Sequence, residues 1–130
     1  MIRLGMIGTG RITHRFVEAV EKVKELQLVC VYNPHEKRAE HYVQSVWKEC
    51  GGEQPVATDS WEQLMELTDA IYIASPHETH YGYMKKALLE NKHVLCEKPM
   101  SLQAEEVEEV YDLAEIQGCS LLEAVKTAYC

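Results

Sequence analysis

The sequence lacks an excess of positive charge and any long apolar run, and each absence excludes a class of protein. Its 13 lysines and arginines are outnumbered by 21 aspartates and glutamates, which gives a formal net charge of −8 at pH 7. A nucleic-acid-binding domain needs a basic face to neutralise phosphates, so we expect no nucleic-acid partner. No segment approaches the run of about 18 apolar residues that a membrane-spanning helix needs, so we expect no membrane partner.

Paired cysteines are also missing. The five cysteines are odd in number, and no two of them form a C-x-x-C motif. Cys30, Cys96 and Cys119 lie within apolar runs, where a reduced cysteine behaves as a small core residue, so we expect neither a disulfide framework nor a zinc site. The first five residues enter an apolar strand pattern directly, without the layout of a signal peptide. We therefore expect a cytoplasmic protein.

The chain has the size and composition of one globular domain, spanning residues 1–130. It contains no internal repeat, low-complexity tract or flexible linker; instead, apolar runs alternate with segments of helical periodicity. The expected strands are 2–7, 26–32, 54–58, 70–74, 93–96 and 120–125. The expected helices are 11–24, 35–49, a short one capped at 59–60, 79–90 and 101–117.

This alternation predicts an α/β fold. Strands that alternate with helices form parallel sheets, because each crossover needs a covering helix. Strands buried on both faces read as continuous apolar runs, as these do. We expect a doubly wound parallel sheet of about six strands, in the order 3-2-1-4-5-6 of a Rossmann fold. The sixth strand would be a sheet edge, through which we expect a homo-oligomer to form.

A glycine-rich turn, Gly8-Thr9-Gly10-Arg11-Ile12, follows the first expected strand and opens the first expected helix. In that context it indicates dinucleotide binding, the alternative being a glycine turn of another α/β fold. Gly8 would make the tight turn, and Gly10 would let the backbone approach a pyrophosphate. The helix N-terminus would offer N–H groups and a partial positive charge. Thr13 stands in place of the third glycine, at a position that concerns helix packing more than phosphate contact.

The residue that ends the second expected strand bears on the choice of cofactor. In many NAD-binding domains a carboxylate at this point accepts hydrogen bonds from the ribose hydroxyls. This sequence has Asn33 there instead. An asparagine can bond a ribose hydroxyl, but it does not repel the 2′-phosphate of NADP. Arg38, about one helical turn on, could attract that phosphate or could be a solvated helix residue. NAD and NADP both stay open at this point.

Two further strings are more specific: DAIYIASPHETH at 69–80 and NKHVLCEKPM at 91–100. Together with the opening MIRLGMIGTGRI they resemble the Gfo/Idh/MocA oxidoreductase family, which includes glucose–fructose oxidoreductase and inositol dehydrogenase. The resemblance covers essentially the whole chain. It implies an NAD(P)-dependent oxidoreductase that acts by hydride transfer on a small molecule, namely a sugar, polyol or similar hydroxy compound.

The resemblance also assigns roles to residues. It implies that the Glu97-Lys98-Pro99 turn lies beside the nicotinamide, with Lys98 as the catalytic residue that binds substrate and handles a proton. It implies that Ser75 and Pro76 pass along the cofactor and that His80 belongs to the structure of that loop. The expected cofactor-binding residues are Gly8, Thr9, Gly10, Arg11, Ile12, Asn33, Arg38, Ser75, Pro76, His80, Glu97 and Lys98. Several follow expected strands, at the sheet edge where open α/β sheets bind ligands.

Some features of the family have no counterpart in this sequence. Its enzymes have a second α/β domain with an aspartate–histidine pair, which is absent here, so we expect this chain to bind cofactor without turning over a substrate alone. Ala128 aligns where some relatives carry an arginine, and His77 stands where the family often has asparagine. A non-enzymatic dinucleotide-binding or interaction module is the alternative, and the identity of the substrate stays open.

Two polar clusters invite other interpretations. The string from His77 to His80 is one residue short of H-E-x-x-H, so it would not place two histidines on one helical face, and we expect no metal. The glutamates and aspartate of 104–117 are expected to form a solvated helix face.

Overall fold

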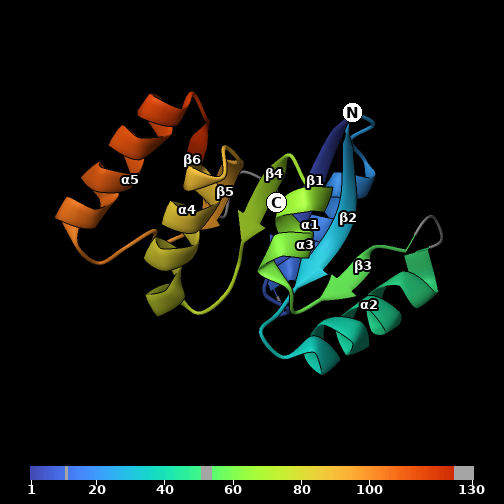
Figure 1. The fold of residues 1–130 in the computed structure, drawn as a ribbon. Coiled ribbons are helices and arrows are strands. Elements are labelled where there is room, and N and C mark those ends of the chain that lie inside the picture. The colour runs from blue at the N-terminus through green and yellow to red at the C-terminus, as the bar shows by residue number, and fades with distance from the viewer. Residues whose placement is uncertain (11, 51–53, 125–130) are drawn as a thin grey trace.

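The structure, a computed structural model, describes residues 1–10, 12–50 and 54–124, and it confirms the expected α/β fold (Figure 1). One six-stranded sheet has the order β3-β2-β1-β4-β5-β6, as expected, and every neighbouring pair is parallel. The strands are β1 (Ile2–Ile7), β2 (Leu26–Tyr32), β3 (Val56–Thr58), β4 (Ala70–Ile73), β5 (His93–Glu97) and β6 (Leu121–Ala124). The helices are α1 (Ile12–Glu21), α2 (Glu36–Cys50), α3 (Trp61–Leu67), α4 (His80–Leu89) and α5 (Ala104–Gln117), with a 3-10 turn, η1 (His77–Thr79), before α4.

The helices divide between the two faces of the sheet. From β1 the chain winds outward through β2 to β3 and then crosses back to β4, so the later crossovers lie on the opposite face. One core cluster joins the sheet to α1 and α2 through Phe16, Val17 and Val43. The other joins it to α3, α4 and α5, and Figure 1 shows α4 and α5 together at one end of the sheet. Each face therefore buries its own apolar layer.

The sheet edge formed by β6 is incompletely covered. Leu95 of β5 pairs in register with Leu122 of β6, so the two side chains point to the same face of the sheet. Farther along the sheet, α1 and α2 cover that face. Leu95 packs against that core cluster, but Leu122 is 62% exposed. The sixth strand is thus an edge, as the sequence predicts.

Several element ends differ from those expected. Helix α1 ends at Glu21 rather than Lys24 because the Lys22 and Val23 N–H groups bond to carbonyls three residues back, and Val23 is 41% exposed instead of packing on the core. Strand β3 begins at Val56, after Pro55, which has no N–H to donate to a ladder. Helix α5 ends as expected at Gly118, which adopts a left-handed φ of 68°.

The three cysteines whose side chains the structure describes have the expected structural role. Cys30 and Cys96 are free and fully buried, and Cys119 is free and partly buried. Burial raises the pKa of the Cys30 and Cys96 thiols to about 12. Protonated thiols of this kind act as small core residues rather than as nucleophiles.

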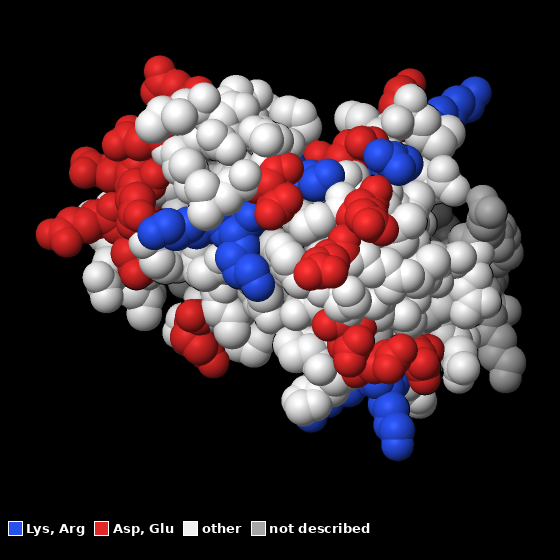
Figure 2. Space-filling view, viewed as in Figure 1, with Lys and Arg blue, Asp and Glu red and all other residues white. Residues whose placement is uncertain are grey.

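The acidic face of α5 is largely exposed, as expected. Acidic side chains gather over α5 at one end of the molecule (Figure 2). Glu105, Glu108, Glu109 and Asp112 are all exposed. Glu109 also forms an ion pair with Lys85 (3.0 Å) and accepts a hydrogen bond from Tyr81, and these contacts link α5 to α4.

The described residues contain neither a candidate membrane span nor a cluster of metal ligands. None of the helices in that part of the chain is both long and apolar enough to cross a membrane. Within the same residues, no group of three or more His, Cys, Asp or Glu side chains could hold a metal ion.

Candidate functional site

The turn after β1 is built around Gly8. Its φ is +111°, a backbone conformation that residues with a side chain rarely adopt. A Cβ at this position would lie 2.7 Å from the carbonyl carbon and oxygen of Ala74 and 2.9 Å from the Ser75 nitrogen. Since the Ala74 N–H also donates to the Ile7 carbonyl (2.8 Å), the glycine turn is held directly against the end of β4.

The other glycine of the turn faces open space. A Cβ at Gly10 would meet no heavy atom within 4 Å, although Gly10 lines a cavity. The Gly10 carbonyl is held in place by Thr13 of α1, which is fully buried. The Thr13 hydroxyl (2.5 Å) and the Thr13 N–H (3.1 Å) both donate to this carbonyl. Thr13 thus serves the packing of the turn, as expected. Arg11 lies outside the described residues, and Ile12 is the first residue of α1.

A cavity of about 590 Å³ opens beside this turn, within the usual range for a small-molecule site. It lies at the carboxyl ends of β1, β2 and β4, where the strand order of the sheet reverses. Its lining is Ile7, Gly8, Thr9, Gly10, Asn33, Pro34, His35, Arg38, Ala74, Ser75, Pro76, Thr79 and Tyr83. The structure therefore brings together seven of the residues that the sequence nominates: Gly8, Thr9, Gly10, Asn33, Arg38, Ser75 and Pro76.

Asn33 connects the glycine turn to the loop before α2. Its side-chain oxygen accepts the His35 N–H (2.8 Å), and its amide group donates to the Thr9 hydroxyl (3.4 Å). A second cavity of about 430 Å³ adjoins this point and shares Thr9 and Arg38 with the first. The remaining lining residues of the second cavity are Lys37, His41, Tyr42 and Ser45.

The glycine turn and the cavity beside it are consistent with a dinucleotide-binding domain, and a family model matches the sequence. The family model described as oxidoreductase family, NAD-binding Rossmann fold (Gfo/Idh/MocA) matches residues 2–124. The chain belongs to this family. Because the matching model is that of the NAD-binding fold, the chain is an NAD(P)-binding domain of a Gfo/Idh/MocA oxidoreductase.

Individual Gfo/Idh/MocA relatives support the assignment. The chain is 34% identical over 134 residues to scyllo-inositol 2-dehydrogenase (NADP(+)) of Bacillus subtilis strain 168, covering 99% of this chain and 38% of that protein. It is 34% identical over 115 residues to glucose-6-phosphate 3-dehydrogenase of the same organism, covering 88% of this chain and 31% of that protein. A solved 3-ketoreductase from Actinomadura kijaniata, in complex with NADP and TDP-benzene, matches with a TM-score of 0.79 and 28% identity over 94% of this chain and 36% of that one. The chain thus spans only 31–38% of these relatives.

The loop after β4 is braced by His80. This histidine is 2% exposed, and its two ring nitrogens lie 2.8 Å from the carbonyl oxygens of Ser75 and Pro99. Carbonyl oxygens only accept, so a ring nitrogen that carries a proton donates to the carbonyl that it faces. His80 does not line either cavity around Asn33. It instead joins the Ser75 loop to the Lys98–Pro99 turn. Its expected contribution to cofactor binding stays a prediction.

The end of β5 carries the other nominated residues. Glu97 is buried and accepts a hydrogen bond from the Tyr72 hydroxyl, and the Tyr72 ring stacks on Phe16 (3.7 Å between centroids). Lys98 is exposed and precedes Pro99 across a cis peptide bond. Neither Glu97 nor Lys98 lines the 590 Å³ cavity, so both lie on the β5 side of the site rather than beside the glycine turn.

Tyr83 is the main site residue that the sequence does not reveal. It lines the cavity from α4 and stacks on Trp61 (5.9 Å between centroids), and it meets Tyr32 edge to face (6.1 Å). Partial burial raises the pKa of its hydroxyl. The helical periodicity of 79–90 places Tyr83 on the same face as Thr79 and His80, which was the available signal.

Replacing His80 with alanine should lower the free energy of unfolding by about 2–4 kcal/mol, because it removes a packed ring and leaves two carbonyl groups without a donor. Urea unfolding followed by circular dichroism measures the effect. His77→Ala is the matched control, since His77 precedes α4 in the same loop but is exposed. Equal unfolding midpoints for His80→Ala and the wild type would contradict the bracing role.

Proposed function

We propose that the chain holds the cofactor of an NAD(P)-dependent dehydrogenase that transfers hydride to or from a sugar, polyol or similar hydroxy compound. The observation that carries the proposal is the contrast within the glycine turn. Gly8 is locked against the end of β4, whereas Gly10 leaves open space beside the cavity that it lines. Such space lets a ligand approach the backbone where any side chain would intrude.

The residues present fit a dinucleotide. The glycine turn and the start of α1 would bind the pyrophosphate, because unbonded N–H groups and the partial positive charge of a helix N-terminus favour anions there. Asn33 and Tyr83 would contact the adenosine half on the β2 side of the cavity. Ser75 and Pro76 would lie along the half that extends toward β5.

Lys98 would be the general acid–base residue of this chain. When bound, the nicotinamide accepts or donates the hydride. Lys98 follows β5 with an exposed ammonium group, which can bind the substrate oxygen and pass a proton to or from it. His80 would hold the turn that carries Lys98 in place through its bond to the Pro99 carbonyl.

The relatives point to the class of substrate. Two of them are named for oxidising a hydroxyl at a numbered position of inositol or of glucose 6-phosphate, so we propose a ring hydroxyl of a sugar or cyclitol as the target. The 130 residues of this chain match only 31–38% of the length of these relatives. We therefore expect the 130-residue chain to bind cofactor without steady-state oxidation of scyllo-inositol or glucose 6-phosphate, and clear turnover would contradict this division of labour.

Two finer proposals concern the setting in which the protein works. The reduced, buried thiols of Cys30 and Cys96 suit the reducing cytoplasm, where we propose that it acts. Among the described residues β6 is the last strand of the sheet, and we propose that a second copy associates along this edge.

Replacing Gly10 with valine should weaken binding of both NADH and NADPH by at least about tenfold, equivalent to roughly 1.4 kcal/mol, while leaving the fold intact. The reason is that the added Cβ would lie in open space beside the cavity, with no heavy atom within 4 Å apart from those of its chain neighbours, so the side chain would occupy room that the ligand needs. Calorimetric titration of both proteins measures the affinities, with circular dichroism as the folding control. Equal affinities would show that the glycine turn is structural only.

A further inference from the structure

We propose that Glu123 is a positioning residue, which acts with His80 to hold the Lys98 ammonium group at the reacting end of the bound cofactor. The inference rests on the proposed function, in which Lys98 is the general acid–base residue, and it names what fixes Lys98 in place. It depends on the bonds to a single peptide unit of the Lys98 turn, on the register of β6 beside β5, and on the anchoring of the chain that follows the turn.

The peptide unit that joins Pro99 to Met100 is bonded at both of its polar atoms. The Pro99 carbonyl oxygen lies 2.8 Å from Nδ1 of His80 in α4. On the other side of the unit, the Met100 N–H donates to Oε2 of Glu123 in β6 (3.0 Å). In a planar trans peptide unit the C=O and N–H groups point in opposite directions. The two bonds together therefore fix the tilt of this unit, whereas a single bond would leave the unit free to turn.

The register of the sheet places Glu123 beside the end of β5. Glu123 pairs with Cys96, which directly precedes Glu97 and Lys98 in the chain. Paired residues of neighbouring strands point to the same face, so the Glu123 side chain lies on the face of Cys96, where the core cluster joins the sheet to α4 and α5. Burial, and then the nearby Glu123 and Glu97 carboxylates, raise the pKa of the Cys96 thiol to about 12. A carboxylate is thus available on the face toward which the chain leaves β5.

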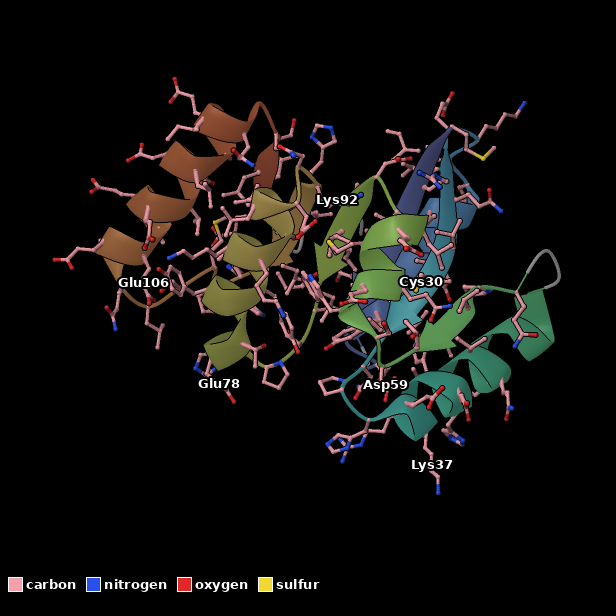
Figure 3. All side chains as sticks on the ribbon, in the orientation of Figure 1. Cys30, Lys37, Asp59, Glu78, Lys92 and Glu106 are labelled. Atoms are coloured by element: carbon pink, nitrogen blue, oxygen red, sulfur yellow. The ribbon has the colours of Figure 1, made fainter. Side chains whose placement is uncertain are left out.

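The chain that follows this peptide unit is anchored as well. The Met100 side chain is 2% exposed and belongs to the core cluster with α4 and α5. The Ser101 hydroxyl donates to the Glu106 carboxylate (2.5 Å) and accepts the Gln103 N–H (3.1 Å). Figure 3 shows Glu106 on the first turn of α5, where the loop from β5 enters the helix. Because the chain after the turn is held in this way, fixing the tilt of the peptide unit also fixes the backbone of Lys98.

The bond to Glu123 can be removed without unpacking the core. A carboxylate acceptor makes a charge-assisted hydrogen bond, which is roughly twice as strong as a neutral one. Glu123 is itself exposed, so its truncation leaves no cavity among the buried side chains. Lys98 and Pro99 are exposed, whereas the residues on either side of them are buried, so a looser turn would move Lys98 alone. We therefore expect the loss of Glu123 to change where Lys98 lies rather than whether the domain folds.

Amide exchange in the 130-residue chain tests the bond itself. Solution NMR follows the exchange of the Met100 N–H in the wild type, Glu123→Ala and Glu123→Gln. Exchange should be about tenfold faster in Glu123→Ala but within about threefold of the wild type in Glu123→Gln, because the glutamine side chain keeps a carbonyl oxygen at the same reach. Glu115→Ala is the matched control, since it removes a carboxylate from an exposed position near the end of α5 and should leave Met100 exchange unchanged.

The position of Lys98 is measured on the same variants with NAD+ as the probe. Reductive methylation with isotope-labelled formaldehyde labels the lysine amines while keeping their positive charge, and Lys98→Met identifies the Lys98 resonance. Saturating NAD+ should shift this resonance in the wild type and in Glu123→Gln, because the proposed function places the charged nicotinamide beside it. The shift should be less than about half as large in Glu123→Ala, while the Kd of NAD+ measured by calorimetry should change by less than about threefold.

A second variant keeps the inference testable if Glu123→Ala folds poorly. Glu123→Asp keeps the charge but shortens the side chain, so it should weaken the same bond and reduce the Lys98 shift. Three results would overturn the inference while leaving NAD+ binding intact: unchanged Met100 exchange in both variants, a full Lys98 shift despite faster exchange, or equal defects in Glu123→Ala and Glu123→Gln. Absence of NAD+ binding by the wild type would instead overturn the proposed function, and the inference with it.

Discussion

Replacing Lys98 with methionine should lower the rate of hydride transfer by about 10²–10⁴-fold, the usual contribution of a general acid–base group. The expectation applies to an enzyme that joins this chain to the second domain of its family. Methionine keeps much of the apolar stem of lysine but removes the ammonium group, so the substrate oxygen loses its proton partner. Because Lys98 does not line the cavity beside the glycine turn, the dissociation constant of NADH should change by less than about threefold.

Stopped-flow measurement of hydride transfer, with fluorescence titration of NADH, separates these two effects. Lys22→Met is the matched control, because Lys22 is an exposed lysine just after α1 and lines none of the cavities described above. Near-normal transfer by Lys98→Met would mean that Lys98 is only a turn residue. A large loss of NADH affinity would mean instead that it holds the cofactor.

The sheet could be predicted because its determinants are local. The central strands β1 and β4 are apolar runs that are mostly buried on both faces, and each crossover is a helical segment, so the alternation alone implies parallel strands. The glycine turn could be predicted for the same reason, since Gly8 and Gly10 follow a strand and precede a helix. Gly118 likewise marks the end of α5 through its own backbone conformation.

The parts that could not be predicted depend on contacts between distant segments. His80 binds the Pro99 carbonyl 19 residues away, and no local pattern indicates that its second nitrogen is also satisfied. Glu109 resembles its solvated neighbours in sequence, but α4 places Lys85 against it. Tyr83 reaches the cavity from α4, where its ring contacts Trp61 and Tyr32 from other parts of the chain. Helical periodicity predicts on which face of its helix each residue lies, but it does not predict which distant residue that face will contact.

Replacing Gly8 with alanine should lower the free energy of unfolding by about 3 kcal/mol or more, a large fraction of the roughly 5–15 kcal/mol that stabilises a typical domain. Two costs add at this position. A side chain at φ +111° is strained by about 1–3 kcal/mol, and its Cβ would lie 2.7 Å from backbone atoms of Ala74 that cannot rotate away. Relieving that overlap requires the turn to move away from β4, at a further cost of about 1–3 kcal/mol.

Three glycine-to-alanine variants separate these costs within one protein. Gly10→Ala introduces neither an unusual φ nor a close contact, so its unfolding midpoint in urea should stay near that of the wild type. Gly118→Ala introduces only the left-handed φ of 68°, with no atom within 4 Å, and should cost about 1–2 kcal/mol. Gly8→Ala carries both the strain and the overlap, so it should unfold at the lowest urea concentration of the three. If Gly8→Ala were no less stable than Gly118→Ala, the close approach of the glycine turn to β4 would not constrain the fold, and the loop against Ala74 would have to be free to shift.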